Sequence, residues 1–480
     1  MGFIENIVSF IPEVKAPSQK KLAFKDKFKW TLLILILFFT LGTISLFGLD
    51  PNYESQFEQF SLILGAQFGS IISLGIGPIV TASIVLQLLN GSGLIKFDTS
   101  TQEGRKKFQG TQKLLAIFFV VFEAIVYVYF GGFAPPSVDI VGLGMFNTLR
   151  MVLIGQLILG GLLIMIMDEV IQKWGFGSGI GLFIIANVAQ EIFVQAFSPL
   201  NATGSLYLGS GQEPIGKLWQ FFIFLSQNNP NAAYLAAAAI IATVVVFMVS
   251  VFTQAMKIEI PLSFGRVRGY GMRWPLKFMY TSNMPVILIA ALLANFQLWA
   301  QLMEGLAVKS SSAILNFISV HILGQVNTAQ TGGGIVQFVN PPNLVQALIT
   351  NSLSWPMMQI AIGYILLMTL GSMLFALFWV QTSGQDAHNQ AKNIMKSGLQ
   401  IPGFRKDARI LERILQRYIG PLTIMGGLAV GILASLADLS GALSRGTGIL
   451  LAVMITYQIY EEIAKQHMMD MNPMMRKMFE

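Results

Sequence analysis

Ten helix-length runs of apolar residues limit how this chain can fold more than any other feature. Each run is close to the ~20 residues that a helix needs to cross a hydrocarbon core about 30 Å thick. The composition agrees, since 54% of the 480 residues are hydrophobic and only 11% are charged, which excludes an ordinary soluble domain. We therefore expect an all-α integral membrane protein with ten transmembrane helices. The runs lie at residues 30–48, 72–91, 112–131, 148–167, 178–197, 234–253, 278–299, 355–380, 419–437 and 446–464.

The distribution of lysine and arginine predicts how these helices are oriented. Nearly all of the 31 Lys and Arg residues fall in alternate connections, on the side where the N-terminus lies. The exceptions are Arg150, Lys217, Lys309 and Arg445. Because connections rich in basic residues stay in the cytoplasm, we predict a multi-pass protein of the cell membrane with both termini cytoplasmic.

Ten spans also predict how the chain is divided. Two sets of five spans place the second set upside down relative to the first, which is inverted-repeat topology. The two halves share no strong sequence identity, so this prediction rests on topology alone. The predicted parts are a cytoplasmic N-terminal segment at 1–29, a first half at 30–197, an external connecting loop at 198–233, a second half at 234–464 with cytoplasmic loops at 254–277 and 382–418, and a cytoplasmic tail at 465–480.

A short apolar segment at 57–69 precedes the second run and is unlike the ten runs. As a helix it would be only about 20 Å long, which is too short to span. A break with the sequence Gly75-Ile76-Gly77-Pro78 separates it from most of the following span. Membrane proteins tolerate such interruptions where the backbone lines or fills a cavity. The pattern therefore indicates a channel or a transporter.

The sequence offers little for catalysis or cofactor binding. It contains no cysteine and three histidines, and each of His321, His388 and His467 is isolated in its own loop or tail, which leaves no cluster for a metal ion. No Gly-Lys pair is followed by Ser or Thr, as a phosphate-binding loop would require. We expect a protein that is not an enzyme and has neither cofactor nor metal. A glycosylation sequon at residues 201–203, in the external loop, is a weak signal.

Few ionisable residues fall inside the predicted spans, so those that do are candidates for function. Glu123 lies midway along the third span, and Asp168 and Glu169 lie at an interfacial helix end. One buried glutamate is thin support for a proton relay, and an interhelical hydrogen bond explains it equally well. Thr81 and Asn295 are uncharged polar residues of the second and seventh spans; they act either as simple interhelical contacts or as a seam that can separate.

Several short motifs together resemble one known family. They lie at residues 11–14, 74–81, 177–184, 259–262, 282–288, 403–406 and 446–451. On these motifs the chain resembles SecY, the channel subunit of the protein-conducting translocon, and its archaeal branch in particular. The resemblance extends from residue 11 to the C-terminus.

The resemblance implies an hourglass pore between the two halves, narrowed by a ring of aliphatic side chains. Residues 57–69 would form a plug, with Phe57, Phe60, Leu64 and Gln67 among its members. Thr81, Glu123 and Asn295 match polar positions of a lateral gate. Met284 departs from the isoleucine common in relatives and is left out of the ring. The ring positions carried over are Ile76, Val80, Ile180, Ile184, Ile287 and Leu451.

The resemblance also implies partners and a function. Small membrane subunits of the SecE and Sec-beta types, a ribosome, signal sequences, nascent polypeptides and the lipid bilayer are expected around the pore. The two basic cytoplasmic loops would bind ribosomal RNA phosphates, although from the residues alone anionic lipid is an alternative ligand. The docking residues carried over are Lys257, Arg266, Arg268, Arg405 and Lys406.

The expected function is a protein-conducting channel, gated by plug and lateral gate, that passes secretory polypeptides across the membrane and releases transmembrane segments sideways into lipid. The alternative is an inverted-repeat secondary transporter of a small solute, which would need polar or charged groups converging at mid-membrane. A third possibility is an insertase or scaffold without a pore.

Overall fold

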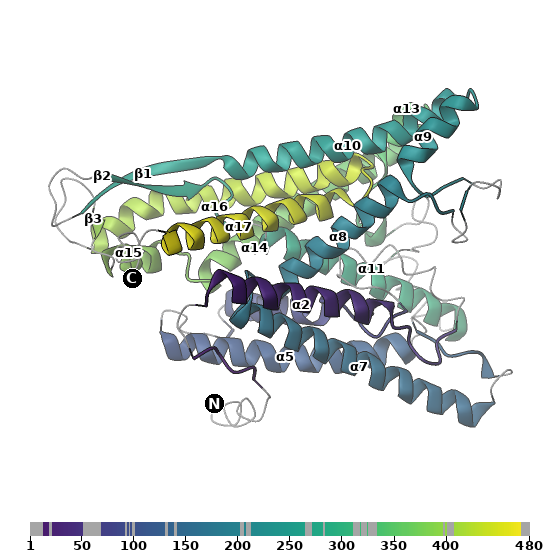
Figure 1. Cartoon of the computed structure of the whole chain (residues 1–480), viewed down its shortest axis with the longest axis horizontal. Coiled ribbons are helices and arrows are strands. Elements are labelled where there is room, and N and C mark those ends of the chain that lie inside the picture. Colours follow the sequence, from purple (N-terminus) through teal and green to yellow (C-terminus); the bar gives the residue numbers. More distant parts are fainter. Residues whose placement is uncertain are drawn as a thin grey trace.

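Most of the chain is described by a computed structural model, drawn in Figure 1. The structure describes residues 13–18, 22–50, 69–91, 94–95, 97, 101–129, 133–138, 142–201, 206–207, 213–264, 271–281, 284–310, 317, 324, 334–396, 399–400 and 408–471. The predicted all-helical character is confirmed, apart from one small sheet.

Each of the ten predicted apolar runs overlaps one helix of the structure. Among the residues that the structure describes, six helices are long and apolar enough to cross a membrane, and α4 and the first part of α11 are shorter apolar helices. The helices that overlap the ten runs are α2 (Phe24–Thr43), α4 (Gly77–Gly91), α5 (Gln102–Tyr129), α7 (Leu143–Trp174), α8 (Gly179–Phe197), α10 (Pro230–Ala255), α11 (Met284–Ser310), α14 (Trp355–Thr382), α16 (Ala408–Leu439) and α17 (Gly446–Met471). Shorter helical pieces are α9 (Lys217–Ser226), η3 (Ile335–Phe338), α13 (Leu344–Ile349) and α15 (Ala387–Lys396).

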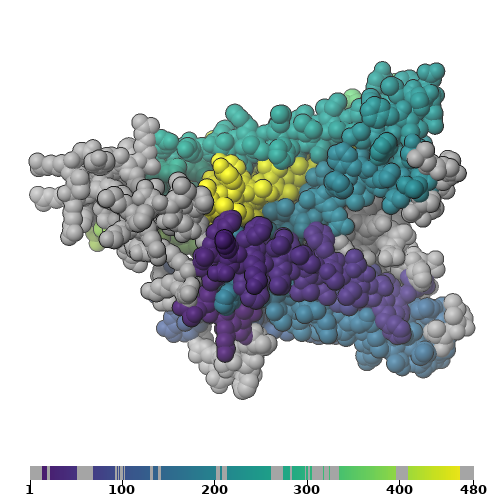
Figure 2. All heavy atoms as spheres, viewed as in Figure 1, coloured from purple at the N-terminus to yellow at the C-terminus, as the bar shows by residue number. Residues whose placement is uncertain are grey.

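The long helices gather on two sides of the molecule. In Figure 1, α2, α5 and α7 lie along one side and α10, α16 and α17 along the other, with α8 and α11 between them. On the face shown in Figure 2, α17 is visible between α2 and α10. The main apolar core is continuous across the molecule, because it takes buried residues from α2, α4, α8, α11, α14 and α17.

Glycines allow α14 and α16 to pack closely. A Cβ atom added at Gly431 of α16 would lie 2.6 Å from the Cα atom of Thr369 in α14. One at Gly427 would lie 3.0 Å from the Cα atom of Met373. Membrane helices use small residues in this way because close backbone approach maximises van der Waals contact where no hydrophobic effect drives helices together.

The basic segment at 254–277, expected as a loop, contains a β-hairpin. Strand β1 (Lys257–Phe264) pairs antiparallel with β2 (Gly271–Lys277), and β3 (Leu399–Gln400) joins the free edge of β1. Buried Ile260 and Leu276 anchor the hairpin against Leu411 and Leu415 of α16. Alternating apolar and polar residues favour a strand that is buried on one face, and the glycine and arginine content of the segment masked that signal.

Candidate functional site

The six predicted ring residues lie at the beginnings of four helices. Ile76 immediately precedes α4, and the other five fall within the first six residues of α4, α8, α11 or α17. The ring residues are therefore drawn from the N-terminal ends of four different helices.

These side chains belong to one apolar cluster. Five of them are buried, with exposed fractions between 1% and 6%, and Ile180 is half-buried against the same cluster. The structure thus brings together residues that are up to 375 positions apart in the sequence, from Ile76 to Leu451. Aliphatic groups at such a point offer a passing polar solute or chain no hydrogen-bonding partner.

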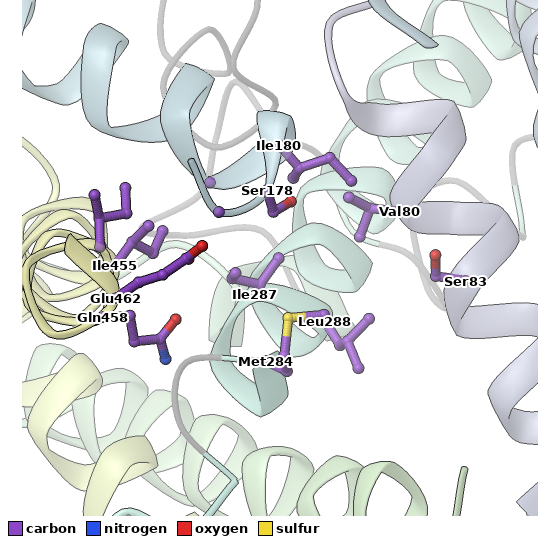
Figure 3. A pocket seen from close by; sticks show the side chains of 13 residues that line it. Val80, Ser83, Ser178, Ile180, Met284, Ile287, Leu288, Ile455, Gln458 and Glu462 are labelled. Atoms are coloured by element: carbon purple, nitrogen blue, oxygen red, sulfur yellow. The ribbon is translucent and has the colours of Figure 1, made fainter. Parts of the chain in front are cut away.

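A cavity of about 160 Å³ adjoins the cluster and is shown in Figure 3. Val80, Ile180 and Ile287 face it from α4, α8 and α11, and Gln458 and Glu462 face it from α17. Most of the lining is apolar, so no set of charged groups converges here as a solute transporter would need. The cavity is instead a small apolar space between the helices that carry the ring.

Met284 also lines this cavity, one turn before Ile287. The family resemblance leaves Met284 out of the ring, because relatives often carry isoleucine at that position. The structure places it beside the ring residues, and its spacing of three from Ile287 on one helix was the available signal. Methionine fits such a position because its side chain is flexible and apolar.

The three polar residues predicted to lie together do so. The Asn295 side-chain amide of α11 donates a hydrogen bond to Thr81 Oγ1 of α4 at 2.9 Å. Thr81 Oγ1 lies 3.4 Å from Glu123 Oε1 of α5 and 2.9 Å from the Gly77 carbonyl oxygen of its own helix. These contacts join α4 to α5 and to α11.

Asp168 and Glu169 of α7 hold the structure together rather than line the cavity. Asp168 Oδ1 accepts a hydrogen bond from the backbone N–H of Ile180 at 3.0 Å, and Oδ2 accepts one from Gln172 at 2.8 Å. Glu169 lies 2.9 Å from both Lys113 Nζ and Lys173 Nζ. Both carboxylates therefore have structural partners, and their assignment as functional candidates stays a prediction.

Asp438 of α16 was missed by the sequence analysis. Its Oδ1 accepts a hydrogen bond from the backbone N–H of Thr447 at 2.8 Å. Its Oδ2 accepts one from the Tyr364 hydroxyl at 2.5 Å and another from the Thr447 hydroxyl. The residue lies one position beyond the run predicted at 419–437, outside the predicted spans in which ionisable residues were considered.

Some predicted sites lie outside the described residues. The plug residues Phe57, Phe60, Leu64 and Gln67 are among them, as are Arg266, Arg268, Arg405 and Lys406 of the docking loops. Lys257 is described: it lies on β1, its side chain is 56% exposed, and its Nζ is 3.7 Å from Glu259 Oε1.

The sequon asparagine is not accessible in the folded chain. Asn201 is only 1% exposed and forms an isolated bridge with Pro214. A glycosyltransferase needs the free side-chain amide, so this burial opposes modification after folding.

In the part of the chain that the structure describes, no group of three or more His, Asp or Glu residues is arranged to hold a metal ion.

Comparison with known proteins identifies this architecture. The SecY family model matches residues 70–460. The protein translocase subunit SecY of Methanothermobacter thermautotrophicus is 42% identical, with 98% of this chain and 97% of that protein aligned. The subunit of Pyrococcus horikoshii is 39% identical, with 98% and 97% aligned.

Solved structures of related proteins have a similar fold. One described as the structure of a protein-conducting channel is 38% identical with a TM-score of 0.77, and 96% of each chain is covered. Sec61 from a canine ribosome–channel complex is 37% identical with a TM-score of 0.74, again with 96% of each chain covered. The fold and the site therefore define a helical membrane channel for polypeptides. The chain belongs to the SecY family, and the expected resemblance is confirmed.

The channel function follows, because the relatives are protein translocase subunits rather than enzymes and the fold is that of protein-conducting channels. The alternative of a solute transporter is not supported by any of these relatives.

Proposed function

We propose that the aliphatic cluster is the closed constriction of a gated polypeptide pore. The observation that carries this proposal is the convergence of six aliphatic residues from the N-terminal ends of four helices: Ile76, Val80, Ile180, Ile184, Ile287 and Leu451. An apolar constriction gives a polypeptide no strong site at which to bind, and it can close to water and ions by dewetting. Secretory chains would pass through it, and transmembrane segments would leave sideways into lipid.

We also propose ten spans in two inverted halves, 30–197 and 234–464. The inverted arrangement is supported by local similarity between the helices that carry the proposed constriction, α4, α8, α11 and α17, which we call the pore helices. Residues 178–181 at the start of α8 read Ser-Gly-Ile-Gly, and residues 445–448 at the start of α17 read Arg-Gly-Thr-Gly. Proline is the second residue of both α4 and α11. With these starts aligned, Ile184 matches Leu451 and Val80 matches Ile287.

The packing of α8 on α17 supports the same relation. A Cβ atom added at Gly181 would lie 2.9 Å from a methyl group of Ile455, and one at Gly448 would lie 3.2 Å from a methyl group of Val188. In both directions the third residue of one helix meets the tenth residue of the other. A two-fold axis between the halves produces such reciprocal contacts.

Ion pairs support a common side for the N-terminal helix, the C-terminal helix and the hairpin. Lys27 Nζ of α2 lies 3.6 Å from Glu462 Oε1 of α17. Lys277 Nζ of β2 lies 2.6 Å from the neighbouring Glu461. Since the hairpin belongs to a strongly basic connection, we infer that this side is cytoplasmic and that both termini lie there.

The seam formed by Thr81, Glu123 and Asn295 is proposed as the lateral gate. Interhelical hydrogen bonds in membrane proteins contribute only about 0.6 kcal/mol on average. A hydrophobic signal sequence that entered this seam would bury its own apolar surface and would readily replace such contacts. The gate would therefore open for a sufficiently apolar segment and stay closed otherwise.

Residues 57–69 are proposed as the plug. A relative of known structure, 37% identical with a TM-score of 0.75, is described as having a plug domain that stabilises the closed state and maintains a membrane seal. The segment in this chain is short, apolar and followed by the break at residues 75–78, as a movable plug requires.

Ribosome docking is proposed for the basic loops, through Lys257, Arg266, Arg268, Arg405 and Lys406. The support is the canine relative, which is described in a ribosome–channel complex, together with the salt-sensitive attraction between basic side chains and RNA phosphates.

Small subunits of the SecE and Sec-beta types, with lipid, would cover the exposed apolar faces, such as that of α10 around Met248 and Phe252.

Reconstitution tests this function against its alternatives. The channel complex in phospholipid vesicles should make a secretory polypeptide resistant to external protease, and should release one that carries an apolar stop segment into the lipid phase. An insertase without a pore would integrate the second polypeptide and never protect the first. That result would contradict the proposal.

A further inference from the structure

The N-terminus of α8 is capped by a residue from another helix. Ser178, at the N-cap position, makes no side-chain capping hydrogen bond. Asp168 of α7 takes that role, because its Oδ1 accepts a hydrogen bond from the N–H of Ile180 at 3.0 Å. A carboxylate is favoured here, since the first turn of a helix carries unpaired N–H groups and a partial positive charge.

The other half repeats this arrangement. Asp438 of α16 accepts a hydrogen bond from the N–H of Thr447 at 2.8 Å. Thr447 is the second residue of α17, as Ile180 is the second residue of α8. Each aspartate lies late in the long helix that directly precedes its pore helix, and each is joined to it by a tight connection.

Glycine makes both contacts possible. A Cβ atom at Gly179 would lie 2.6 Å from the Cα atom of Asp168, and one at Gly446 would lie 2.0 Å from the carbonyl carbon of Ala437. Each pore helix therefore begins directly against the backbone that carries its aspartate. The close backbone contact at the glycine and the hydrogen bond to the carboxylate together fix the position of the first turn.

The capped amides lie one turn before the constriction residues Ile184 and Leu451, and Ile180 is itself a ring residue. Ile184 follows Ile180 by four residues, and Leu451 follows Thr447 by four residues. One helical turn rises about 5.4 Å and its hydrogen bonds keep it rigid. A displacement of the capped amide is therefore passed on to the constriction side chain.

We propose that Asp168 and Asp438 are a pair of positioning residues, one in each half, that hold the first turns of α8 and α17 so that Ile184 and Leu451 stay in the closed constriction. The inference rests on the proposed constriction. It assigns a role in the resting closure of the constriction to buried Asp168 and half-buried Asp438, neither of which lines the cavity of Figure 3.

Single cysteines provide the test, because the chain contains none. Ile184→Cys or Leu451→Cys would be placed in the full-length channel complex in phospholipid vesicles, and the rate of modification by a small water-soluble methanethiosulfonate reagent would be measured. Asp168→Ala should raise the rate at position 184 roughly fivefold, the change expected for loss of one typical helix cap, and should leave position 451 nearly unchanged. Asp438→Ala should do the reverse.

The control is Glu169→Gln, which removes the adjacent charge of α7 but no cap, and should change neither rate. Equal increases at both positions in either Asp variant would indicate general destabilisation and would overturn the proposal, as would no increase at all. Should an alanine variant not fold, Asp168→Asn and Asp438→Asn keep one acceptor oxygen and should show the same selectivity at smaller size. This readout needs no translocating chain, so it is decided independently of whether polypeptide passes the constriction.

Discussion

The side-chain amide of Asn295 lies 2.9 Å from the Thr81 hydroxyl and is hydrogen-bonded to it, which joins α11 to α4. This contact crosses from the second half of the chain to the first. Beside it, the hydroxyl reaches Glu123 of α5 at a longer 3.4 Å. Such polar contacts are weak, so they add little to the apolar packing of α4 and α11 in opposing separation of the proposed seam.

Removing one of these contacts should favour the open seam. Asn295→Ala is expected to raise the open population about threefold, which corresponds to the ~0.6 kcal/mol of an average interhelical hydrogen bond. Energy transfer between dyes on cysteines at Leu88 of α4 and Phe296 of α11, both partly exposed, would report the separation. Thr148→Val is the control, because Thr148 donates only within its own helix, to the Gly144 carbonyl oxygen. An unchanged distribution in Asn295→Ala would show that this bond does not hold the seam.

A polar side chain in the constriction should make the resting channel leak. Ile184→Asn gives water a partner where dewetting is proposed to close the pore. We expect ion flux through resting vesicles to rise by an order of magnitude, equivalent to a barrier lowered by about 1.4 kcal/mol. Phe193→Asn on the same helix is the control, since Phe193 is 66% exposed. Equal flux in the two variants would argue that Ile184 does not face the pore.

Close packing of α14 on α16 should depend on glycine at one position and not at another. Gly431→Ala would force its Cβ to within 2.6 Å of the Thr369 Cα atom, and such overpacking typically costs about 1–3 kcal/mol. Gly420→Ala on the same helix meets nothing within 4 Å. Thermal unfolding in detergent should therefore show a lower midpoint for the first variant only. A matching loss in both would contradict the packing account, because alanine has the higher helix propensity and by itself would stabilise the helix at either position.

The ion pair between β2 and α17 should be weak and sensitive to salt. Lys277 and Glu461 are about one-third exposed, so screening by solvent limits their coupling to about 0.5–1 kcal/mol. A double-mutant cycle with Lys277→Ala and Glu461→Ala, read by chemical unfolding, should give that value at low ionic strength. The coupling should fall when salt shortens the Debye length. A coupling that is independent of salt would contradict the electrostatic account.

Long apolar runs were enough to predict where the helices lie, because a stretch of about 20 such residues has few alternatives in a membrane. The hairpin at β1 and β2 was not predicted, although Ile260 and Leu276 alternate with polar neighbours. The glycine and basic residue content of this segment predicted a loop, although its short alternation of apolar and polar residues is typical of a strand.

Some residues of the candidate site could likewise be predicted from the sequence, and others could not. Thr81, Glu123 and Asn295 were recognisable as polar residues in apolar helices, whereas the aliphatic ring came only from the family resemblance, since such residues are common throughout the chain. Asp168 was noticed but its partner Ile180 was not. Asp438 was overlooked because a span boundary set by hydropathy stopped at residue 437. Capping by a neighbouring helix depends on tertiary packing, which no local pattern records.

The central claim is that polypeptide passes the cluster that contains Ile184, and disulfide cross-linking tests it directly. The chain would carry Ile184→Cys as its one cysteine, and a stalled secretory chain of varied length would carry another. We predict a cross-link only when the nascent chain is long enough to reach mid-membrane. If no length gave a cross-link at position 184 while a control cysteine at exposed Lys257 did react, the polypeptide would approach the protein without entering this constriction, and the account would be wrong.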